Sequence, residues 1–308
     1  MKFFVTGGAG FIGSHMVDLL LKEGEVVVYD NFSSGKMEFL EDAQKNPGFT
    51  LVEGDLLDYD KLKEAMSGCD WVYHFAANPD VRTGVKEPGR DLEQGVQATF
   101  NVLEAMRANS VENIVFSSSS TVYGEATVLP TPEDYGPLVP ISIYAAAKLG
   151  SEAFITSYAH TFNMRGWIFR FANIIGTRGT HGILVDFKNK LENNPAELEI
   201  LGDGTQKKSY LNVVECVEVM KFAVDNSPEQ VNIFNLGSED QITVARIAEI
   251  VVEELKLPDV KLNYTGGDRG WKGDVPQMSL SIEKVKKLGW QPKRNSEEAI
   301  RDAFRSLL

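Results

Sequence analysis

Tyr144 and Lys148 are the two residues whose types and spacing are best suited to acid–base chemistry. They lie four residues apart in a run of strong helix formers, so a helix would place both side chains on one face. A tyrosine titrates near pH ~10, too high for a base at neutral pH, and a nearby ammonium group favours the phenolate. We therefore expect Lys148 to lower the pKa of Tyr144 and make it a general base. The alternative is a chance pairing on a helix surface.

A run of hydroxyl side chains, Ser117-Ser118-Ser119-Ser120-Thr121, stands upstream of this pair. It follows an apolar segment, residues 114–116, which predicts a strand. Ligands of parallel sheets bind at the carboxyl ends of the strands, where a hydroxyl can contact a substrate oxygen and pass its proton to Tyr144. The alternative is a polar turn that merely ends the strand. The tyrosine downstream favours the functional interpretation.

A glycine-rich loop, Thr6-Gly7-Gly8-Ala9-Gly10-Phe11-Ile12-Gly13, follows a predicted strand and opens a helical pattern. In this context Gly7 suits the tight turn, Gly10 the close approach of a pyrophosphate, and Gly13 the packing of helix on strand. The amino end of the helix would face the anion. The alternative, a simple glycine turn, is less consistent with the acidic residue that ends the next strand.

That acidic residue is Asp30, which suits the adenosine ribose diol of a dinucleotide. Its carboxylate would repel the 2′-phosphate of NADP, and residues 31–33 contain no arginine to accept one. The sequence therefore predicts NAD as the cofactor. Asp55 ends the third predicted strand and is suited either to facing the adenine or to capping the following helix.

Six short apolar runs alternate with helical patterns in the first half of the chain: residues 3–6, 26–29, 49–53, 71–76, 114–118 and 166–171. Buried strands separated by helices predict a parallel sheet with right-handed crossovers, a doubly wound Rossmann-type α/β fold. After residue 175 the chain turns polar and glycine-rich, with one further strand at 231–236. We expect an NAD-binding domain over 1–175, rejoined by about 209–240, and a smaller, mainly substrate-binding lobe over 176–308.

The composition narrows the class of protein. The chain is 43% hydrophobic and 24% charged, as in globular proteins, and its net charge of -13 disfavours nucleic acid and anionic membranes as partners. Cys69 and Cys216 are expected to be reduced packing residues, and the histidines lack metal-ligand spacing, so we predict no metal site. Because the first residues resemble a strand and not a signal peptide, we expect a cytoplasmic protein.

Together these motifs resemble the extended short-chain dehydrogenase/reductase family, and within it the NAD-dependent sugar-nucleotide epimerases of the UDP-galactose (UDP-glucose) 4-epimerase type. The resemblance spans nearly the whole chain. It rests on the glycine loop, Asp30-Asn31, Gly54-Asp55-Leu56, His74-Phe75-Ala76-Ala77, the serine run with Val122-Tyr123-Gly124, Tyr144 with Lys148, Arg170 to Asn173, Gly202-Asp203-Gly204, and Gly273-Asp274-Val275-Pro276.

The resemblance implies Tyr144 as the base, Lys148 as the group that tunes it and holds the nicotinamide ribose, and Ser119 as a hydroxyl partner. The implied NAD contacts, besides Tyr144 and Lys148, are Gly7, Gly10, Phe11, Ile12, Gly13, Asp30, Asn31, Ser33, Gly35, Asp55, Leu56, Phe75, Ala76, Ala77, Ser117 and Ala172. The implied contacts to a UDP-sugar are Ser119, Ser120, Tyr144, Asn173, Phe187, Leu198, Ile200, Lys208, Arg269 and Arg82. It also implies a homodimer formed by helices near 92–107 and 145–160.

The implied reaction is epimerisation at C4 of a UDP-hexose or its N-acetyl or uronate analogue. Bound NAD oxidises C4, the transient 4-keto sugar rotates, and the hydride returns to its opposite face while Tyr144 takes and returns a proton. Related 4,6-dehydratases carry an Asp-Glu pair in the turn where this chain has Ser119-Ser120-Thr121, and decarboxylating relatives usually carry a glutamate where it has Thr121. The alternatives are a dehydratase, decarboxylase or reductase of the same family, or a non-catalytic NAD-sensing protein.

Several positions depart from the family pattern or leave two interpretations. Gly95 replaces a typical asparagine, Ala145 to Ala147 replace Gly-x-Ser, and Lys208 replaces an arginine that grips the diphosphate. Arg269 and Lys272 are further candidates for that contact, and solvated loop charge is the alternative for both. Exposure is the alternative for Arg82, and ordinary core packing is the alternative for Phe187, Leu198 and Ile200. His74 is expected to be a buried, hydrogen-bonded histidine.

Overall fold

The computed structural model describes residues 1–79, 81, 83–270 and 274–308. The chain forms two compact units. Unit 1 comprises residues 1–122, 138–170 and 220–234, and unit 2 comprises residues 123–137, 171–219 and 235–308. Residues 123–137 therefore group with unit 2, and residues 220–234 return to unit 1 within the predicted segment 209–240. The assignment of NAD binding to one unit and substrate binding to the other stays a prediction.

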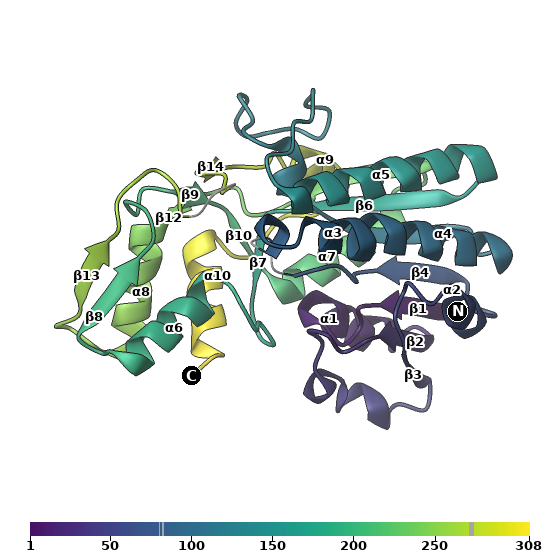
Figure 1. Cartoon of the computed structure of the whole chain (residues 1–308), viewed down its shortest axis with the longest axis horizontal. Helices are drawn as coiled ribbons and strands as arrows, with labels where there is room; N and C mark the ends of the chain where they lie inside the picture. Colours follow the sequence, from purple (N-terminus) through teal and green to yellow (C-terminus); the bar gives the residue numbers. More distant parts are fainter. Residues whose placement is uncertain (80, 82, 271–273) are drawn as a thin grey trace. The chain divides into compact units, whose positions relative to one another are not determined.

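A sheet of seven strands within the described residues forms the centre of unit 1, in the order β11-β6-β5-β4-β1-β2-β3 (Figure 1). The strands are β1 Lys2–Thr6, β2 Glu25–Asp30, β3 Phe49–Glu53, β4 Trp71–His74, β5 Asn113–Ser119, β6 Arg165–Phe171 and β11 Val231–Leu236. This order, with the sequence reversing direction between β3 and β4, is the doubly wound parallel fold that the apolar runs predict. The fold class is confirmed. Strand β4 ends at His74, two residues before its predicted end.

Helices cover both faces of this sheet. Phe4 and Val27 point to one face, where they pack with apolar side chains of α2 (Tyr59–Ala65), α4 (Ala98–Ala108) and α5 (Ile143–Phe162). Val28, the next residue along its strand, points to the opposite face because side chains alternate. There it meets α1 (Phe11–Leu20), since a Cβ on Gly8 would touch both Val28 and Val17. Strand residues buried on both sides explain the unbroken apolar runs.

The parallel register brings the ends of neighbouring strands to one edge. Thr6 of β1 pairs with Tyr29 of β2 and with His74 of β4, and His74 pairs with Phe116 of β5. The segments that follow these residues therefore emerge side by side. They are the glycine loop, Asp30, residues 75–77 and the serine run, so the edge collects the candidate cofactor and catalytic residues.

Three other helical elements complete the part of unit 1 used below. A short helix α3, Pro88–Asp91, continues into a π-helical turn, Leu92–Gln97, which leads into α4. Helix α7, Val213–Asn226, runs from unit 2 into unit 1. Single 3-10 turns lie at Met37–Leu40, Ala43–Lys45, Thr83–Val85 and Ser120–Tyr123.

Unit 2 is built around its own apolar cluster, in which α6, α8 and α10 pack against short strands. Its strands pair as β10 with β7, β13 with β8, and β12-β9-β14. The elements are β7 Asn173–Ile175, α6 Ile183–Asn193, β8 Glu197–Ile200, β9 Lys207–Lys208, β10 Tyr210–Asn212, β12 Ile242–Thr243, α8 Val244–Leu255, β13 Lys261–Tyr264, β14 Gln277–Met278, α9 Glu283–Lys287 and α10 Ser296–Arg305.

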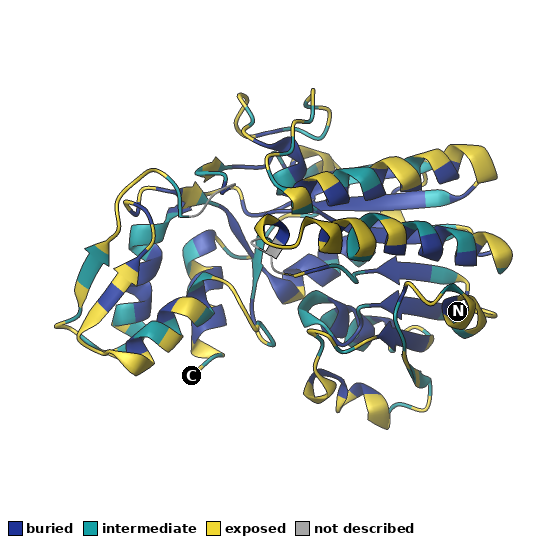
Figure 2. Cartoon of the chain, in the orientation of Figure 1, coloured by how far each residue is buried: buried dark blue, intermediate teal, exposed yellow. Residues whose placement is uncertain are grey.

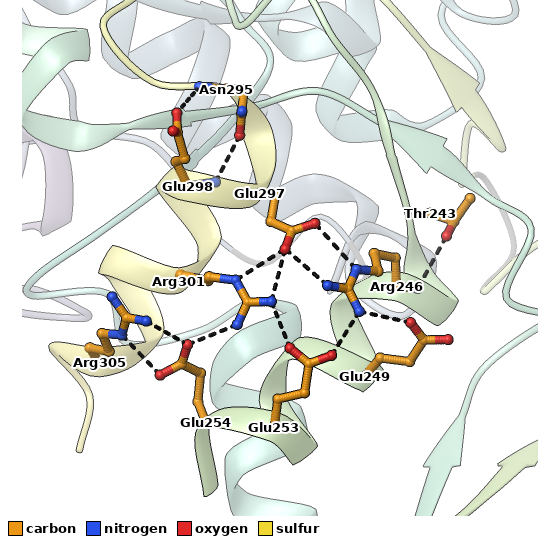
Figure 3. Close-up of polar contacts among 10 residues, drawn as sticks. All are labelled: Thr243, Arg246, Glu249, Glu253, Glu254, Asn295, Glu297, Glu298, Arg301 and Arg305. Carbon is orange, nitrogen blue, oxygen red and sulfur yellow. Dashed lines mark hydrogen bonds and ion pairs between the residues drawn. The ribbon is translucent and has the colours of Figure 1, made fainter.

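A network of ion pairs joins α8 to α10 (Figure 3). Arg301 contacts Glu253, Glu254 and Glu297, with nitrogen–oxygen distances of 2.6, 2.9 and 2.8 Å. Arg246 shares Glu253 and Glu297 from the other side. Because several charges share partners, the network constrains the packing of the two helices more than isolated surface pairs would.

No helix of the described residues is long and apolar enough to span a membrane. The same part of the chain contains no cluster of three or more histidine, cysteine or carboxylate side chains that would hold a metal ion. Cys69 and Cys216 are free and buried, and burial raises the pKa of the Cys69 thiol to about 11. Both thiols are therefore packing groups at neutral pH.

Candidate cofactor and active site

The glycine loop turns sharply and then lies close to neighbouring backbone. Gly7 has φ +67°, and a Cβ there would lie 2.6 Å from the backbone nitrogen of Ala76. A Cβ on Gly13 would lie 2.2 Å from the carbonyl oxygen of Gly7. Glycine is therefore required at both positions by close approach. Gly10 is the extended residue before α1, so the first N–H groups of the helix, beginning at Phe11, have no acceptor within the helix.

Asp30 is held against this loop. One carboxylate oxygen accepts a hydrogen bond from the N–H of Ala9 at 2.9 Å, and the other accepts from the N–H of Phe32 at 2.9 Å. Burial raises the pKa of Asp30, and the two hydrogen bonds act in the opposite direction. A Cβ on Gly35 would lie 2.9 Å from Oδ1 of Asp30, so this glycine leaves room for the carboxylate.

Asn31 and Asp55 form a second polar contact at this end of the sheet. The Asn31 amide donates to Asp55 at 3.0 Å, and its oxygen accepts from the N–H of Ser33. Asp55 also accepts from the N–H of Leu57, while Asp58 caps α2. The capping alternative for Asp55 is therefore wrong, because the cap lies three residues further on. The contact between Asp55 and adenine stays a prediction.

The remaining predicted cofactor residues of unit 1 occupy the same edge. Phe75 donates its N–H to the carbonyl oxygen of Thr6, and Ser117 donates its hydroxyl to the carbonyl oxygen of His74. Ala76 and Ala77 line a cavity with Tyr144 and Lys148. Leu56 is buried beside Tyr29 in the core. A tight glycine turn, unpartnered helix N–H groups and a carboxylate at the second strand fit the phosphates and ribose of a dinucleotide.

Tyr144 and Lys148 share one face of α5, and Ser119 lies next to Tyr144 at the end of β5. Ser142 caps α5 through the N–H of Ala145, so Tyr144 lies in the first turn of the helix. The hydroxyl of Ser119 hydrogen-bonds the Tyr144 phenol. The Lys148 ammonium lies 5.8 Å from the centre of the Tyr144 ring and donates to the carbonyl oxygen of Ser117 at 2.6 Å.

The expected effect of Lys148 on Tyr144 is corrected by the structure. Burial raises the pKa of Tyr144 to about 12, and the group that lowers it is Ser119, not Lys148. Burial in turn lowers the pKa of Lys148 to about 8. The physical reason is that Tyr144 and Lys148 are both buried. The free-energy cost of ionising the phenol away from water exceeds any stabilisation of the phenolate by the ammonium group that lies over its ring. The chain alone thus holds Tyr144 in its neutral form.

A buried ion pair that sequence reasoning missed lies next to Lys148. Glu152, one turn further along α5, accepts hydrogen bonds from the Arg170 guanidinium at 3.0, 3.3 and 2.7 Å. Both side chains are at most 5% exposed. The Ser118 hydroxyl donates to the same carboxylate. The spacing of Tyr144, Lys148 and Glu152 could have placed Glu152 on the same helix face, but no local pattern indicates its pairing with Arg170.

A second missed group is Asp91, at the end of α3. It is 2% exposed and accepts a hydrogen bond from the Asn78 amide at 2.9 Å. Both side chains line the cavity next to Tyr144 and Lys148. The segment Glu87-Pro88-Gly89-Arg90-Asp91 resembles an exposed loop in the sequence, and no local pattern indicated that one carboxylate is buried.

His74 is the buried, hydrogen-bonded histidine that the sequence predicts. Its ring contacts the hydroxyls of Thr6 at 2.6 Å and Thr99 at 3.0 Å. Burial lowers its pKa to about 3, so it is neutral at physiological pH. The ring therefore ties β4 to β1 and α4, and its role is structural.

The departures at Gly95 and Ala147 are coupled. Gly95 lies in the π-helical turn, and a Cβ there would lie 2.9 Å from the Cβ of Ala147 on α5. The carbonyl oxygen of Gly95 accepts a hydrogen bond from Thr99 at 2.8 Å. A side chain at 95 thus has no room next to Ala147, and Asp91 and Asn78 supply the polar groups on this side of the cavity.

The predicted substrate residues of unit 2 are already engaged with neighbours. Asn173 donates to the carbonyl oxygen of Ser209 at 3.3 Å, and Lys208 pairs with Asp274 at 2.5 Å. Arg269 pairs with Glu125 and donates to the carbonyl oxygen of Asp274. A diphosphate would therefore compete with carboxylates for both cations. Their role in substrate binding stays a prediction.

The other predicted substrate and cofactor residues have varied positions. Phe187, Leu198 and Ile200 are buried in the unit 2 core, consistent with the core-packing alternative. Ala172 donates its N–H to the carbonyl oxygen of Leu236 in unit 2. Ser120 is 9% exposed and follows Ser119 in unit 1. Arg82, Lys272 and Gly273 lie outside the described residues.

A family model and a curated relative match the chain over most of its length. Residues 3–237 match the NAD dependent epimerase/dehydratase family. The chain is 33% identical over 305 residues to a putative UDP-glucose 4-epimerase of Methanocaldococcus jannaschii, covering 96% of this chain and 95% of the relative.

Solved structures resemble the chain over its full length. A UDP-galactose 4-epimerase is 43% identical with a TM-score of 0.90, covering 100% of this chain and 98% of that one. A dTDP-glucose 4,6-dehydratase of Streptomyces venezuelae with NAD bound is 26% identical with a TM-score of 0.90, covering 99% and 96%. The fold is thus shared by enzymes of more than one reaction type.

Proposed function

The chain belongs to the NAD dependent epimerase/dehydratase family, and we propose that it interconverts UDP-hexoses that differ in configuration at C4. NAD is its cofactor. The observation that carries the proposal is the contact of Ser119 with Tyr144, with Lys148 beside them, at the sheet edge that also holds the glycine loop. A sugar hydroxyl bound next to these residues would contact Tyr144 as the proton acceptor and Ser119 as the hydroxyl that relays the proton, with the Lys148 cation nearby.

Bound NAD supplies the oxidising and reducing capacity for the sugar carbon. The glycine loop and the amino end of α1 hold its phosphates, and Asp30 holds its adenosine ribose. Tyr144 accepts the proton of the sugar 4-hydroxyl as the carbon is oxidised and returns it as the carbon is reduced. Ser119 orients that hydroxyl, since it already contacts the phenol.

The oxidised nicotinamide ring of bound NAD would carry a positive charge, which would add to that of Lys148 in favouring the Tyr144 phenolate. This is how a phenol with a pKa of about 12 in the chain becomes a base near neutral pH. The proposal therefore requires the cofactor for deprotonation as well as for oxidation.

Epimerisation is favoured over elimination by the turn that follows β5. Thr121 donates its hydroxyl to Ser119 at 2.9 Å, and the turn Ser119-Ser120-Thr121 contains no carboxylate. Eliminating water from a keto-sugar calls for a further acid and base near the substrate, to remove a C–H proton and to protonate the leaving hydroxyl. The side chains of this turn are hydroxyls that contact one another, and none of them is a carboxylic acid or another group that could serve as that acid or base.

For the substrate we propose a UDP-sugar held by unit 2. Asn173 and Lys208 would contact the diphosphate, with Arg269 as a further cation, and residues 187, 198 and 200 would shape the pocket for the base. Lys208 offers charge without the two-pronged geometry of arginine, so its contact with a phosphate depends less on orientation. On binding, phosphate oxygens would replace the carboxylates of Asp274 and Glu125 as the partners of Lys208 and Arg269.

We also propose a homodimer formed through α4 and α5, which lie side by side in unit 1 (Figure 1). Exposed residues run along both helices (Figure 2). Phe154 and Phe162 are 38% and 45% exposed, and Phe100 packs edge-on against Phe154 at 6.0 Å. Exposed aromatic side chains on α5, next to the partly buried Phe100 of α4, are typical of an interface. A cytoplasmic location stays a prediction.

A substrate panel tests the proposed function. Purified protein is incubated separately with UDP-galactose, UDP-N-acetylgalactosamine and UDP-glucuronate, and products are identified by NMR and mass spectrometry. The proposal expects a C4 epimer of equal mass from at least one of them. A product lighter by water or carbon dioxide would favour a dehydratase or decarboxylase, and no product from any sugar would favour an NAD-sensing protein.

A further inference from the structure

Two buried carboxylates lie near Lys148, and their negative charges have different partners. Glu152 is matched by the Arg170 guanidinium and by the Ser118 hydroxyl. Asp91, by contrast, receives one hydrogen bond from the described part of the chain, on Oδ1 from the Asn78 amide. Within the described residues, its Oδ2 is buried and has no hydrogen-bond partner. Asp91 therefore carries a buried charge that a neutral amide alone does not balance.

The local backbone makes room for this carboxylate. A Cβ on Gly84 would lie 2.6 Å from Oδ2 of Asp91, so any larger residue at 84 would press on it. A buried charge without a partner is costly, and proteins that keep one normally place an opposite charge within reach. A side chain of the opposite charge is thus expected on the cavity that Asp91 lines.

Lys148 is the cationic side chain among the described residues that line this cavity. The ionisable groups that face it come from four elements, namely His74 of β4, Asp91 of α3, Arg170 of β6, and Tyr144 and Glu152 of α5. His74 is neutral, and Glu152 is paired with Arg170. Among the described residues that line the cavity, Asp91 is thus the carboxylate without a cationic partner of its own.

We propose that Asp91 is the counter-charge of Lys148 and a positioning residue of the reaction centre, acting on Tyr144 through the lysine. The inference rests on the proposed function of Tyr144 and Lys148. Asp91 keeps Lys148 protonated inside a cavity whose burial would otherwise discharge it. Asn78 and Gly84 fix the carboxylate in the place from which it does so.

The electrostatics of the pair agree with this role. Burial lowers the pKa of Lys148 to about 8, and the charges of Glu152 and Asp91 raise it. Asp91 also raises the pKa of Tyr144. Asp91 therefore favours the protonated forms of both Lys148 and Tyr144 between turnovers. Tyr144 then ionises only when NAD and a sugar are bound.

Titration of Lys148 in the NAD-bound protein tests the inference without requiring turnover. Lysine is labelled with ¹⁵N, and the Lys148 Nζ resonance is assigned by its loss in Lys148→Arg. In Asp91→Asn, which keeps the size of the side chain and removes its charge, the midpoint should fall by about one pH unit. Glu93→Gln removes an exposed charge two residues away and should leave the midpoint unchanged.

A midpoint in Asp91→Asn that equals that of the unaltered protein would overturn the inference. Should Asp91→Asn fail to fold, Gly84→Ala takes its place, because the added Cβ would lie 2.6 Å from Oδ2 of Asp91 and would displace the carboxylate. The Lys148 midpoint should then move, and a midpoint equal to that of the unaltered protein would overturn the inference. A displaced midpoint without any epimerisation would uphold the charge pair and reject the proposed function.

Discussion

The Nζ atom of Lys148 lies 2.6 Å from the carbonyl oxygen of Ser117 and donates a hydrogen bond to it. This contact ties the helix that carries Tyr144 to the strand that carries Ser119. The three side chains are thereby fixed by one helix and one strand of the same unit. Because the lysine is both a structural tie and a charge, its protonation state should control activity.

Activity is expected to fall as the pH rises through the pKa of Lys148, which burial lowers to about 8. Below that pH the ammonium is present, and above it the charge that supports the phenolate is lost. Lys148→Arg keeps its charge throughout this range, so its activity should be lower overall but lack the alkaline decline. The measurement is kcat against pH from 6 to about 10. An unchanged alkaline decline in Lys148→Arg would assign it to another group.

Tyr144→Phe should lower kcat by between about 100-fold and 10,000-fold, because it removes the proton acceptor. NAD content should be unchanged, since the glycine loop and Asp30 remain intact. The matched control is Tyr158→Phe, on the same helix, whose hydroxyl contacts Glu104 at 2.8 Å away from the cavity. Turnover of Tyr144→Phe near the rate of the control would exclude Tyr144 as the base.

Gly13→Ala should lower the amount of NAD that copurifies with the protein and its melting temperature. The added Cβ would lie 2.2 Å from the Gly7 carbonyl oxygen and would force α1 away from the loop. Gly89→Ala is the control, because a Cβ there meets no atom within 4 Å. NAD is quantified by absorbance after denaturation. Full NAD content in Gly13→Ala would show that the loop tolerates displacement of the helix.

Arg301→Met should lower the free energy of unfolding by about 1–2 kcal/mol, because one guanidinium serves three carboxylates between α8 and α10. The loss should shrink as salt is raised, since the side chains are partly exposed. Lys45→Met removes a single exposed ion pair with Asp42, and the change in the free energy of unfolding should be too small to measure. Urea unfolding at low and high salt measures both. A loss that is independent of salt would point to packing and not charge.

The sequence predicts the sheet well, because strands buried on both faces leave unbroken apolar runs such as residues 26–29, which lie in β2. It also predicts the meeting of Tyr144 with Lys148, since a helix fixes that spacing. It does not predict Asp91 or the pairing of Glu152 with Arg170, because burial of a charge depends on distant segments. The direction of the Tyr144 pKa shift was wrong for the same reason, as desolvation leaves no local pattern.

The most direct test of the central claim follows the hydrogen on C4 of the sugar. UDP-glucose carrying deuterium at C4 is incubated with the NAD-bound protein in ordinary water, and the products are examined by NMR. The account predicts UDP-galactose with deuterium retained at C4, because the same hydrogen leaves and returns within one site. Loss of the deuterium to water, or a product other than the C4 epimer, would contradict it.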